Sequence, residues 1–176
     1  GALKIPMVLE GCPVTGIDVY AFQDCVDITS VTIPGTIKTI YLPCFRGCGG
    51  LTNITYVGGF GSGPYNSQDG VLYDRDMKRM FKYPEGRVGS FYTVPSSVTS
   101  LATGCLVGTK LRGVLFEGDC PNATSVAFTD STCAIYRYSD ATGWPVGANA
   151  YWCGRPVILV PRSMMETISS TNPAAI

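Results

Sequence analysis

An internal repeat constrains the fold of this chain more than any other feature of its sequence. Six apolar positions of the segment 14–31 recur in the segment 37–54, as the correspondence of Phe22 with Phe45 illustrates. A third copy begins at Val98 and places Leu106 at the position of Phe22. A period in the low twenties is typical of solenoids, in which each repeat forms one coil and stacks on its neighbours. The repeat therefore predicts a solenoid.

Each copy ends in a pattern that predicts a short β-strand. Val31 and Ile33 are β-branched and two positions apart, which favours a strand with one face directed inward. The preceding segments, 18–25 and 41–48, show no alternation and predict a helical or 3₁₀ turn that directs a phenylalanine inward. Neighbouring coils must supply the strand hydrogen bonds and the second wall of the core, so we expect a coil to be stable only within a stack.

The chain resembles the BspA-type leucine-rich repeats of bacterial surface proteins in two runs, AFQDC with ITSVTIPGTIKTI (21–40) and FYTVPSSVTSLATGCL (91–106). The ATGW run at 141–144 is similar to the end of such arrays, and the resemblance covers 14–156. The third copy departs from the pattern at Thr109, where the earlier copies have cysteine.

This resemblance implies a fold and a role. The implied fold is a β-rich solenoid, a right-handed leucine-rich-repeat superhelix of short parallel strands joined by helical or 3₁₀ turns. The implied role is adhesion or recognition at a cell surface, with a protein or glycan of the cell surface or the host matrix as the partner. The family pattern carries no catalytic residues to transfer to this chain.

The repeat period is interrupted once. Ile37 corresponds to Val98, so the third copy begins much later than a single period would place it. The additional segment, at about 58–90, begins with a glycine-rich stretch that predicts a loop, and its part 70–84 predicts a β-hairpin. Because the strand pattern resumes in register from Tyr92, we expect the hairpin to pack along the stack or to project from it, rather than to form a second domain.

The chain therefore divides into three predicted parts. Residues 1–13 form an N-terminal edge or cap, and 14–156 form the leucine-rich-repeat domain with its insertion. Residues 157–176 supply a strand, a short helix from Ser163 and a tail. Because the chain opens on Gly1 without methionine, the lack of a signal peptide says little about localisation. The resemblance implies an extracellular or cell-surface protein, and we expect its signal peptide to be missing from this sequence.

Composition excludes several classes of function. Thirteen basic residues balance thirteen acidic ones without a strong basic cluster, which disfavours nucleic acid and other polyanions as partners. No apolar run has the length of a membrane span. The chain has no histidine, which removes Ser-His-Asp and Cys-His catalysis, so we expect neither an enzyme nor a cofactor. Asp74 and Asp76 predict solvated turn residues, with a weak calcium site as the alternative.

Four of the eight cysteines occupy repeat positions. Cys25 and Cys48 share one position, while Cys44 and Cys105 share the small position of Ala21. This register predicts buried thiols that act as small hydrophobic side chains. A disulfide between Cys25 and Cys48, on neighbouring coils, remains an alternative.

The other four cysteines lie outside the repeat core, at Cys12, Cys120, Cys133 and Cys153. A bridge between Cys120 and Cys133 is an alternative to free thiols in an oxidising compartment. A zinc site is disfavoured because the chain has no Cys-x-x-Cys motif and no histidine to complete a ligand set.

Candidate ligand-binding residues follow from strand alternation and from the hairpin. Alternation places small polar residues and tyrosines on the outer face of one stacked sheet, and tyrosine gives a large contact area at low entropic cost. The hairpin adds a mixed basic and aromatic strip. We expect the binding residues to be Ser30, Thr32, Asn53, Thr55, Leu115, Glu117, Tyr136, Tyr138, Lys78, Arg79, Phe81 and Lys82.

Two functions remain open on these observations. The first is a non-catalytic binding module of the kind that the resemblance implies. The alternative is a structural spacer or scaffold segment of a larger surface protein, in which the outer face is simply solvated.

Overall fold

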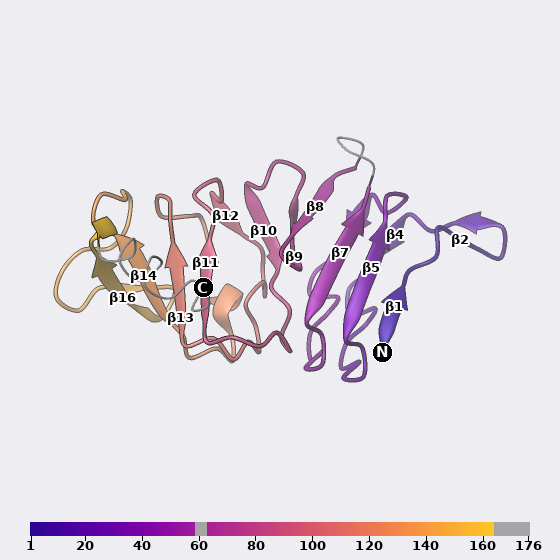
Figure 1. The fold of residues 1–176 in the computed structure, drawn as a ribbon, viewed down its shortest axis with the longest axis horizontal. Helices are drawn as coiled ribbons and strands as arrows, with labels where there is room; N and C mark the ends of the chain where they lie inside the picture. The colour runs from indigo at the N-terminus through magenta and orange to yellow at the C-terminus, as the bar shows by residue number, and fades with distance from the viewer. Residues whose placement is uncertain (59–62, 164–176) are drawn as a thin grey trace.

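The structure is a computed structural model that describes residues 1–58 and 63–163 as an elongated stack of short β-strands (Figure 1). The N-terminus lies near one end of the stack, and strand β16 (Arg155–Val160) lies near the other. The solenoid predicted from the repeat is confirmed. Apart from Ser163 itself, the predicted helix that begins there lies outside the described residues, and so does the tail.

The first parallel sheet consists of β1 (Ala2–Lys4), β5 (Ser30–Pro34) and β7 (Asn53–Val57). Val31 pairs with Ile54, which occupies the same position in the next copy of the repeat. Both side chains are fully buried. The sequence period therefore becomes the register of the sheet.

A second, smaller sheet lies on the other side of the same coils and pairs β4 (Gly16–Ile17) with β6 (Thr39–Ile40). The chain between β4 and β5 turns through short-range backbone hydrogen bonds, such as Cys25 N to Phe22 O at 3.4 Å. These are 3₁₀-type turns, but they form no regular helix. An exposed hairpin of β2 (Val8–Leu9) and β3 (Cys12–Pro13) precedes them.

The insertion is a three-stranded antiparallel meander rather than a loop followed by a hairpin. Its strands are β8 (Tyr65–Gln68), β9 (Val71–Asp74) and β10 (Arg79–Lys82). The loop predicted for 58–70 is thus wrong over β8, a polar strand with little apolar alternation to identify it; residues 59–62 lie outside the described part. Strand β10 then pairs in parallel with β12 (Ser100–Leu101), so the meander joins the two halves of the stack.

The second half of the stack forms a five-stranded sheet. In spatial order its strands are β11 (Phe91–Val94), β13 (Gly113–Phe116), β14 (Ala134–Tyr138), β16 and β15 (Tyr151–Trp152). A 3₁₀ helix, η1 (Ser125–Phe128), precedes β14. Trp144 and Trp152 pack 5.0 Å apart between ring centres and cover Phe116, which closes this part of the core.

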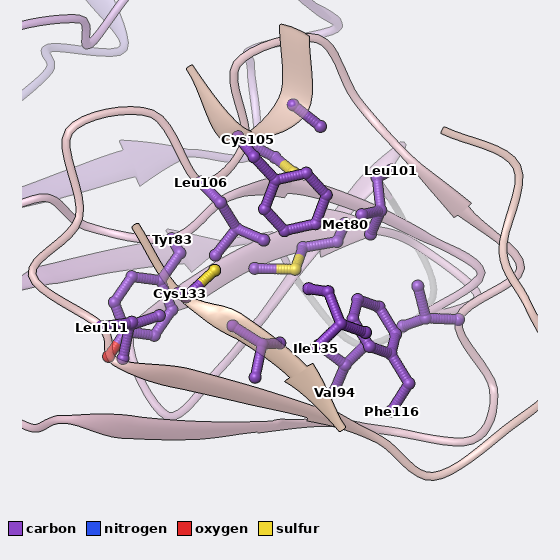
Figure 2. Packing of buried hydrophobic residues seen from close by; sticks show 14 of the residues in the cluster. Met80, Tyr83, Val94, Leu101, Cys105, Leu106, Leu111, Phe116, Cys133 and Ile135 are labelled. Atoms are coloured by element: carbon purple, nitrogen blue, oxygen red, sulfur yellow. The ribbon is translucent and has the colours of Figure 1, made fainter. Parts of the chain in front are cut away.

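The interior divides into two hydrophobic clusters, one in each half of the stack. The first contains Phe45, Leu51 and Ile54 among its fully buried side chains. The second surrounds Met80 and Leu106, and Figure 2 shows Met80 in the middle of the labelled side chains. Partly buried Leu42 packs against both clusters.

Burial differs between the first coil and the second. Phe45 and Cys48 are 0% exposed, whereas Phe22 and Cys25, at the same repeat positions, are only half-buried. The rings of Phe22 and Phe45 are stacked, with centres 5.4 Å apart. Strand β5 of the first coil lies between β1 and β7, but β4 of the same coil pairs with β6 alone, so the turn that carries Phe22 and Cys25 is less covered than the equivalent turn of the second coil.

A buried ion pair fixes the meander to the coil before it. Lys82 Nζ lies 2.8 Å from Glu85 Oε1, and the two side chains are 3% and 6% exposed. The backbone N–H of Gly47 donates to the same carboxylate oxygen at 3.2 Å. Since a buried charge is tolerated only when it is paired and hydrogen-bonded, this contact defines how the end of β10 sits against the preceding turn.

Candidate functional site

A groove of about 370 Å³ opens where the second sheet is interrupted, between β6 and the meander. Strands β6, β8 and β10 and the segments after β6 and β12 supply its walls. The lining residues are Thr39, Ile40, Tyr41, Leu42, Tyr65, Arg79, Phe81 and Thr103. The groove lies within the range of roughly 300–1,000 Å³ that is typical of small-ligand sites.

Aromatic rings form one wall of this groove. Tyr65 meets Phe81 edge to face, with ring centres 5.2 Å apart, and Tyr56 meets Tyr65 at 5.8 Å. The hydroxyl of Tyr65 accepts a hydrogen bond from the backbone N–H of Ile40 at 2.7 Å. Burial raises the pKa of Tyr65, so the hydroxyl stays protonated and retains its own hydrogen for donation. Tyr41, which is 55% exposed, adds a further aromatic surface.

Arg79 is the charged residue of the groove lining. Its guanidinium carbon lies 5.3 Å from the centre of the Phe81 ring, a cation–π contact that holds the planar group over the aromatic wall. The turn before it is fixed by Asp74 Oδ1, which accepts from the backbone N–H groups of Lys78 at 2.7 Å and Arg79 at 2.9 Å. Among residues 1–58 and 63–163, neither ion pair involves Arg79.

The structure brings the first four predicted binding residues together on the outer side of β5 and β7. Ser30 pairs with Asn53 and Thr32 with Thr55, and all four are half-buried. The Asn53 amide donates to the Thr55 hydroxyl at 2.8 Å. These four residues form a small polar face, in which Asn53 and Thr55 already hydrogen-bond to each other.

The next four predicted residues lie on the far half of the stack, and two of them are buried. Leu115 is 1% exposed and Tyr138 is 8% exposed, so the exposure predicted for them is wrong. Tyr136 is half-buried and its ring lies 5.0 Å from that of Phe91. Glu117, at the end of β13, is also half-buried. Strand alternation assigns a side chain to one face of a sheet, but it cannot predict what covers that face.

The hairpin residues also separate. Lys78 and Arg79 are exposed and Phe81 is half-buried, but Lys82 is buried in its ion pair with Glu85. The prediction that Lys82 is exposed is therefore wrong. Of the predicted residues, Arg79 and Phe81 alone line the groove.

The single outer face predicted for the solenoid is divided in two. Strands β5 and β7 belong to a sheet separate from that of β13 and β14. In Figure 1 the meander strands lie between these two sheets. The polar residues of the first sheet and Tyr136 therefore do not lie on one continuous sheet, and a ligand bound along the first sheet would not reach Tyr136 on that sheet.

Sequence reasoning missed the rest of the groove. Tyr65 lies in the stretch that predicted a loop, and Thr39 and Thr103 are ordinary polar residues of the coils. Tyr41 carried a usable signal, because it occupies the repeat position of Asp18 and places a large aromatic ring at an exposed position of the coil.

The structure shows all eight cysteines as free thiols, and neither alternative bridge is present. Cys44, Cys48 and Cys105 are buried, as the repeat register predicts, and Cys25 is half-buried. Burial raises the pKa of Cys44 and Cys105 to about 12 and that of Cys48 to about 11. These thiols are hydrophobic core groups and weak nucleophiles.

We expect thiol modification to distinguish these groups sharply. At pH 8 roughly one Cys44 thiol in ten thousand is ionised, given its pKa of about 12. Iodoacetamide should therefore modify the exposed Cys12 rapidly and reach Cys44, Cys48 and Cys105 only on unfolding. Mass spectrometry of peptides from native and urea-treated protein measures this, with Cys12→Ser as the control. Rapid native modification of Cys44 would contradict the assigned burial.

Within the described part of the chain, no helix is long and apolar enough to cross a membrane. The same residues contain no group of three or more cysteine, aspartate or glutamate side chains placed to hold a metal ion. Asp74, one half of the alternative calcium pair, accepts backbone hydrogen bonds within its turn.

Comparison with protein families agrees with the repeat. Residues 12–62 match the model described as BspA type Leucine rich repeat region (6 copies). These residues include the first two copies of the repeat, so the resemblance found in the sequence is confirmed. This part of the chain is similar to BspA-type leucine-rich repeats. No curated protein matches the sequence.

Solved structures show the same fold. A leucine-rich repeat protein from Eubacterium ventriosum ATCC 27560 is similar over 90% of this chain, with 13% identity and a TM-score of 0.54. The pneumococcal vaccine antigen PcpA is similar over 92% of this chain, with 14% identity and a TM-score of 0.53. The chain spans 47% and 58% of the lengths of these two proteins.

Proposed function

We propose that this protein is a non-catalytic binding module of the cell surface or of secreted origin, which recognises a protein or glycan through the groove beside the meander. The observation that carries this proposal is the exposed Arg79, held over Phe81 without an ion-pair partner among the described residues. Groups that point into a groove and remain unpaired are available to a ligand.

The architecture supports a binding role in a second way. The meander interrupts the regular stack and thereby creates a concave surface lined by side chains from both halves. The absence of histidine from the sequence removes the common acid and base of hydrolytic catalysis. The BspA-type repeats, and the description of one similar structure as a vaccine antigen, support a location at the surface.

Binding to an immobilised panel of extracellular-matrix proteins and polysaccharides tests this function. We expect saturable binding that Tyr41→Ala weakens about tenfold or more, because exposed aromatic side chains at the centre of a site carry much of the binding energy. Tyr151→Ala is the matched control, since Tyr151 is 62% exposed and belongs to β15, away from the groove.

A third variant, Tyr136→Ser, tests the outer face of the five-stranded sheet. Loss of binding in this variant, with Tyr41→Ala unaffected, would move the binding surface from the groove to that sheet. A folded protein that binds nothing on the panel would favour the alternative function, a structural spacer or scaffold segment of a larger surface protein.

A further inference from the structure

The groove between β6 and the meander combines a guanidinium that has no ion-pair partner among the described residues with aromatic rings and hydroxyl groups in a small volume. We propose that this groove binds a terminal acidic sugar, a pyranose ring that carries one carboxylate. This inference rests on the proposed binding function. The carboxylate would pair with Arg79, and the ring would lie against the aromatic wall.

The shape of the Arg79 site favours a carboxylate. A guanidinium presents its N–H donors in a fixed plane that matches the two oxygens of a carboxylate. The guanidinium carbon of Arg79 lies 5.3 Å from the centre of the Phe81 ring. Because this contact already restricts the arginine side chain, less of its conformational freedom is lost on binding. Among the described residues, those that line the groove include no aspartate or glutamate that could pair with the guanidinium first.

The remaining lining residues favour a sugar as the carrier of that carboxylate. A pyranose has apolar C–H faces that pack on aromatic rings and hydroxyl groups that need hydrogen-bonding partners. Tyr41, Tyr65 and Phe81 supply the rings. Thr39 of β6 and Thr103, which follows β12, supply hydroxyls. Both threonines are exposed.

The same geometry disfavours an acidic peptide. A peptide that docks in extended form adds a strand to a free sheet edge and uses its backbone hydrogen-bonding groups. At the β6 edge the backbone N–H of Ile40 is already bonded to the Tyr65 hydroxyl at 2.7 Å. A peptide strand would have to break that bond to continue the sheet.

Charge and size favour a single terminal residue over a long acidic polymer. The chain has thirteen basic and thirteen acidic residues, so no broad positive field attracts a polyanion. Arg79 is the one charged side chain among the lining residues described. A groove of about 370 Å³ suits a small ligand rather than an extended chain.

Titration calorimetry with sialyllactose and a glucuronic-acid-terminated disaccharide, each beside its neutral counterpart, tests this inference. We expect one or both acidic sugars to bind at least tenfold more tightly than lactose or the glucose-terminated disaccharide. Arg79→Gln should weaken that binding roughly 10- to 100-fold, since hydrogen bonds to charged groups are among the stronger ones. Lys78→Gln removes the same charge from the exposed neighbouring residue and should change affinity less than threefold.

Each other outcome is informative. Equal binding of acidic and neutral sugars, or equal losses in Arg79→Gln and Lys78→Gln, would overturn the carboxylate assignment while leaving a glycan-binding function intact. Tight binding of an acidic peptide in place of either sugar would overturn the choice of ligand class. If the sugars fail but a panel protein binds, this inference falls and the proposed function stands; if neither binds, both fall.

Discussion

Replacing Lys82 by methionine is expected to lower the free energy of unfolding by about 3–5 kcal/mol, the cost of leaving a buried charge without its partner. Lys82 and Glu85 are 3% and 6% exposed, so water cannot replace the lost ammonium group. Methionine has a similar length and no charge, so the loss of stability comes mainly from the Glu85 carboxylate that is left without a partner. Urea denaturation followed by circular dichroism measures the change.

Two further variants separate the ion pair from simple packing. Lys82→Met combined with Glu85→Gln should recover much of the lost stability, because the second change removes the uncompensated charge and keeps an oxygen for the Gly47 N–H. Lys78→Met, at an exposed position immediately before β10, should change stability by less than about 0.5 kcal/mol. A Lys82→Met protein as stable as the parent would show that this pair does not hold the meander in place.

Replacing Phe45 by alanine is expected to cost about 3–5 kcal/mol of stability, because the side chain is fully buried and its removal leaves a cavity. Phe22→Ala is the matched comparison, since it removes the same group from the same repeat position one coil earlier. Phe22 is only half-buried, so the expected loss is smaller, at about half that of Phe45.

Denaturant unfolding of the two phenylalanine variants in parallel measures this difference. The rings stack at 5.4 Å, so each substitution also removes part of the other ring's contact, and the comparison between variants is sharper than either value alone. Equal losses would mean that the first coil is as well covered as the second, contrary to the described burial.

The repeat predicted most of the fold because one physical rule operates in every coil. Val31 and Ile54 are both inward, buried and paired, so one period of the sequence carries the chain from a strand to its neighbour in the sheet. The period also resumed correctly at Tyr92 after the insertion, where β11 begins the second parallel stack.

The insertion was less predictable because its strands obey other rules. Strand β8 is polar and exposed at alternate positions, so its sequence resembles a loop. Lys82 resembled a surface residue of a hairpin, but the nearby Glu85 supplies the partner that allows its burial. Patterns of hydrophobicity cannot reveal such a pairing, because it depends on how the meander closes.

The candidate groove was predictable only in part for a related reason. Arg79 and Phe81 follow from the mixed basic and aromatic strand. Tyr41 and Thr103 come from coils on either side of the insertion and are therefore far apart in the chain. The insertion of the meander between these coils brings Tyr41 and Thr103 to one groove, and no local sequence pattern predicts that arrangement.

The meander also lies between two hydrophobic clusters, one in each half of the stack, so we expect the two halves to unfold as separate segments. In a linear array, unfolding can begin at one boundary and spread, so the joint between segments limits cooperativity. The groove lies at this joint, with Tyr41 on one segment and Thr103 on the other. A ligand bound in the groove would contact both halves of the stack and hold them together. The free energy of unfolding would therefore rise when the site is occupied.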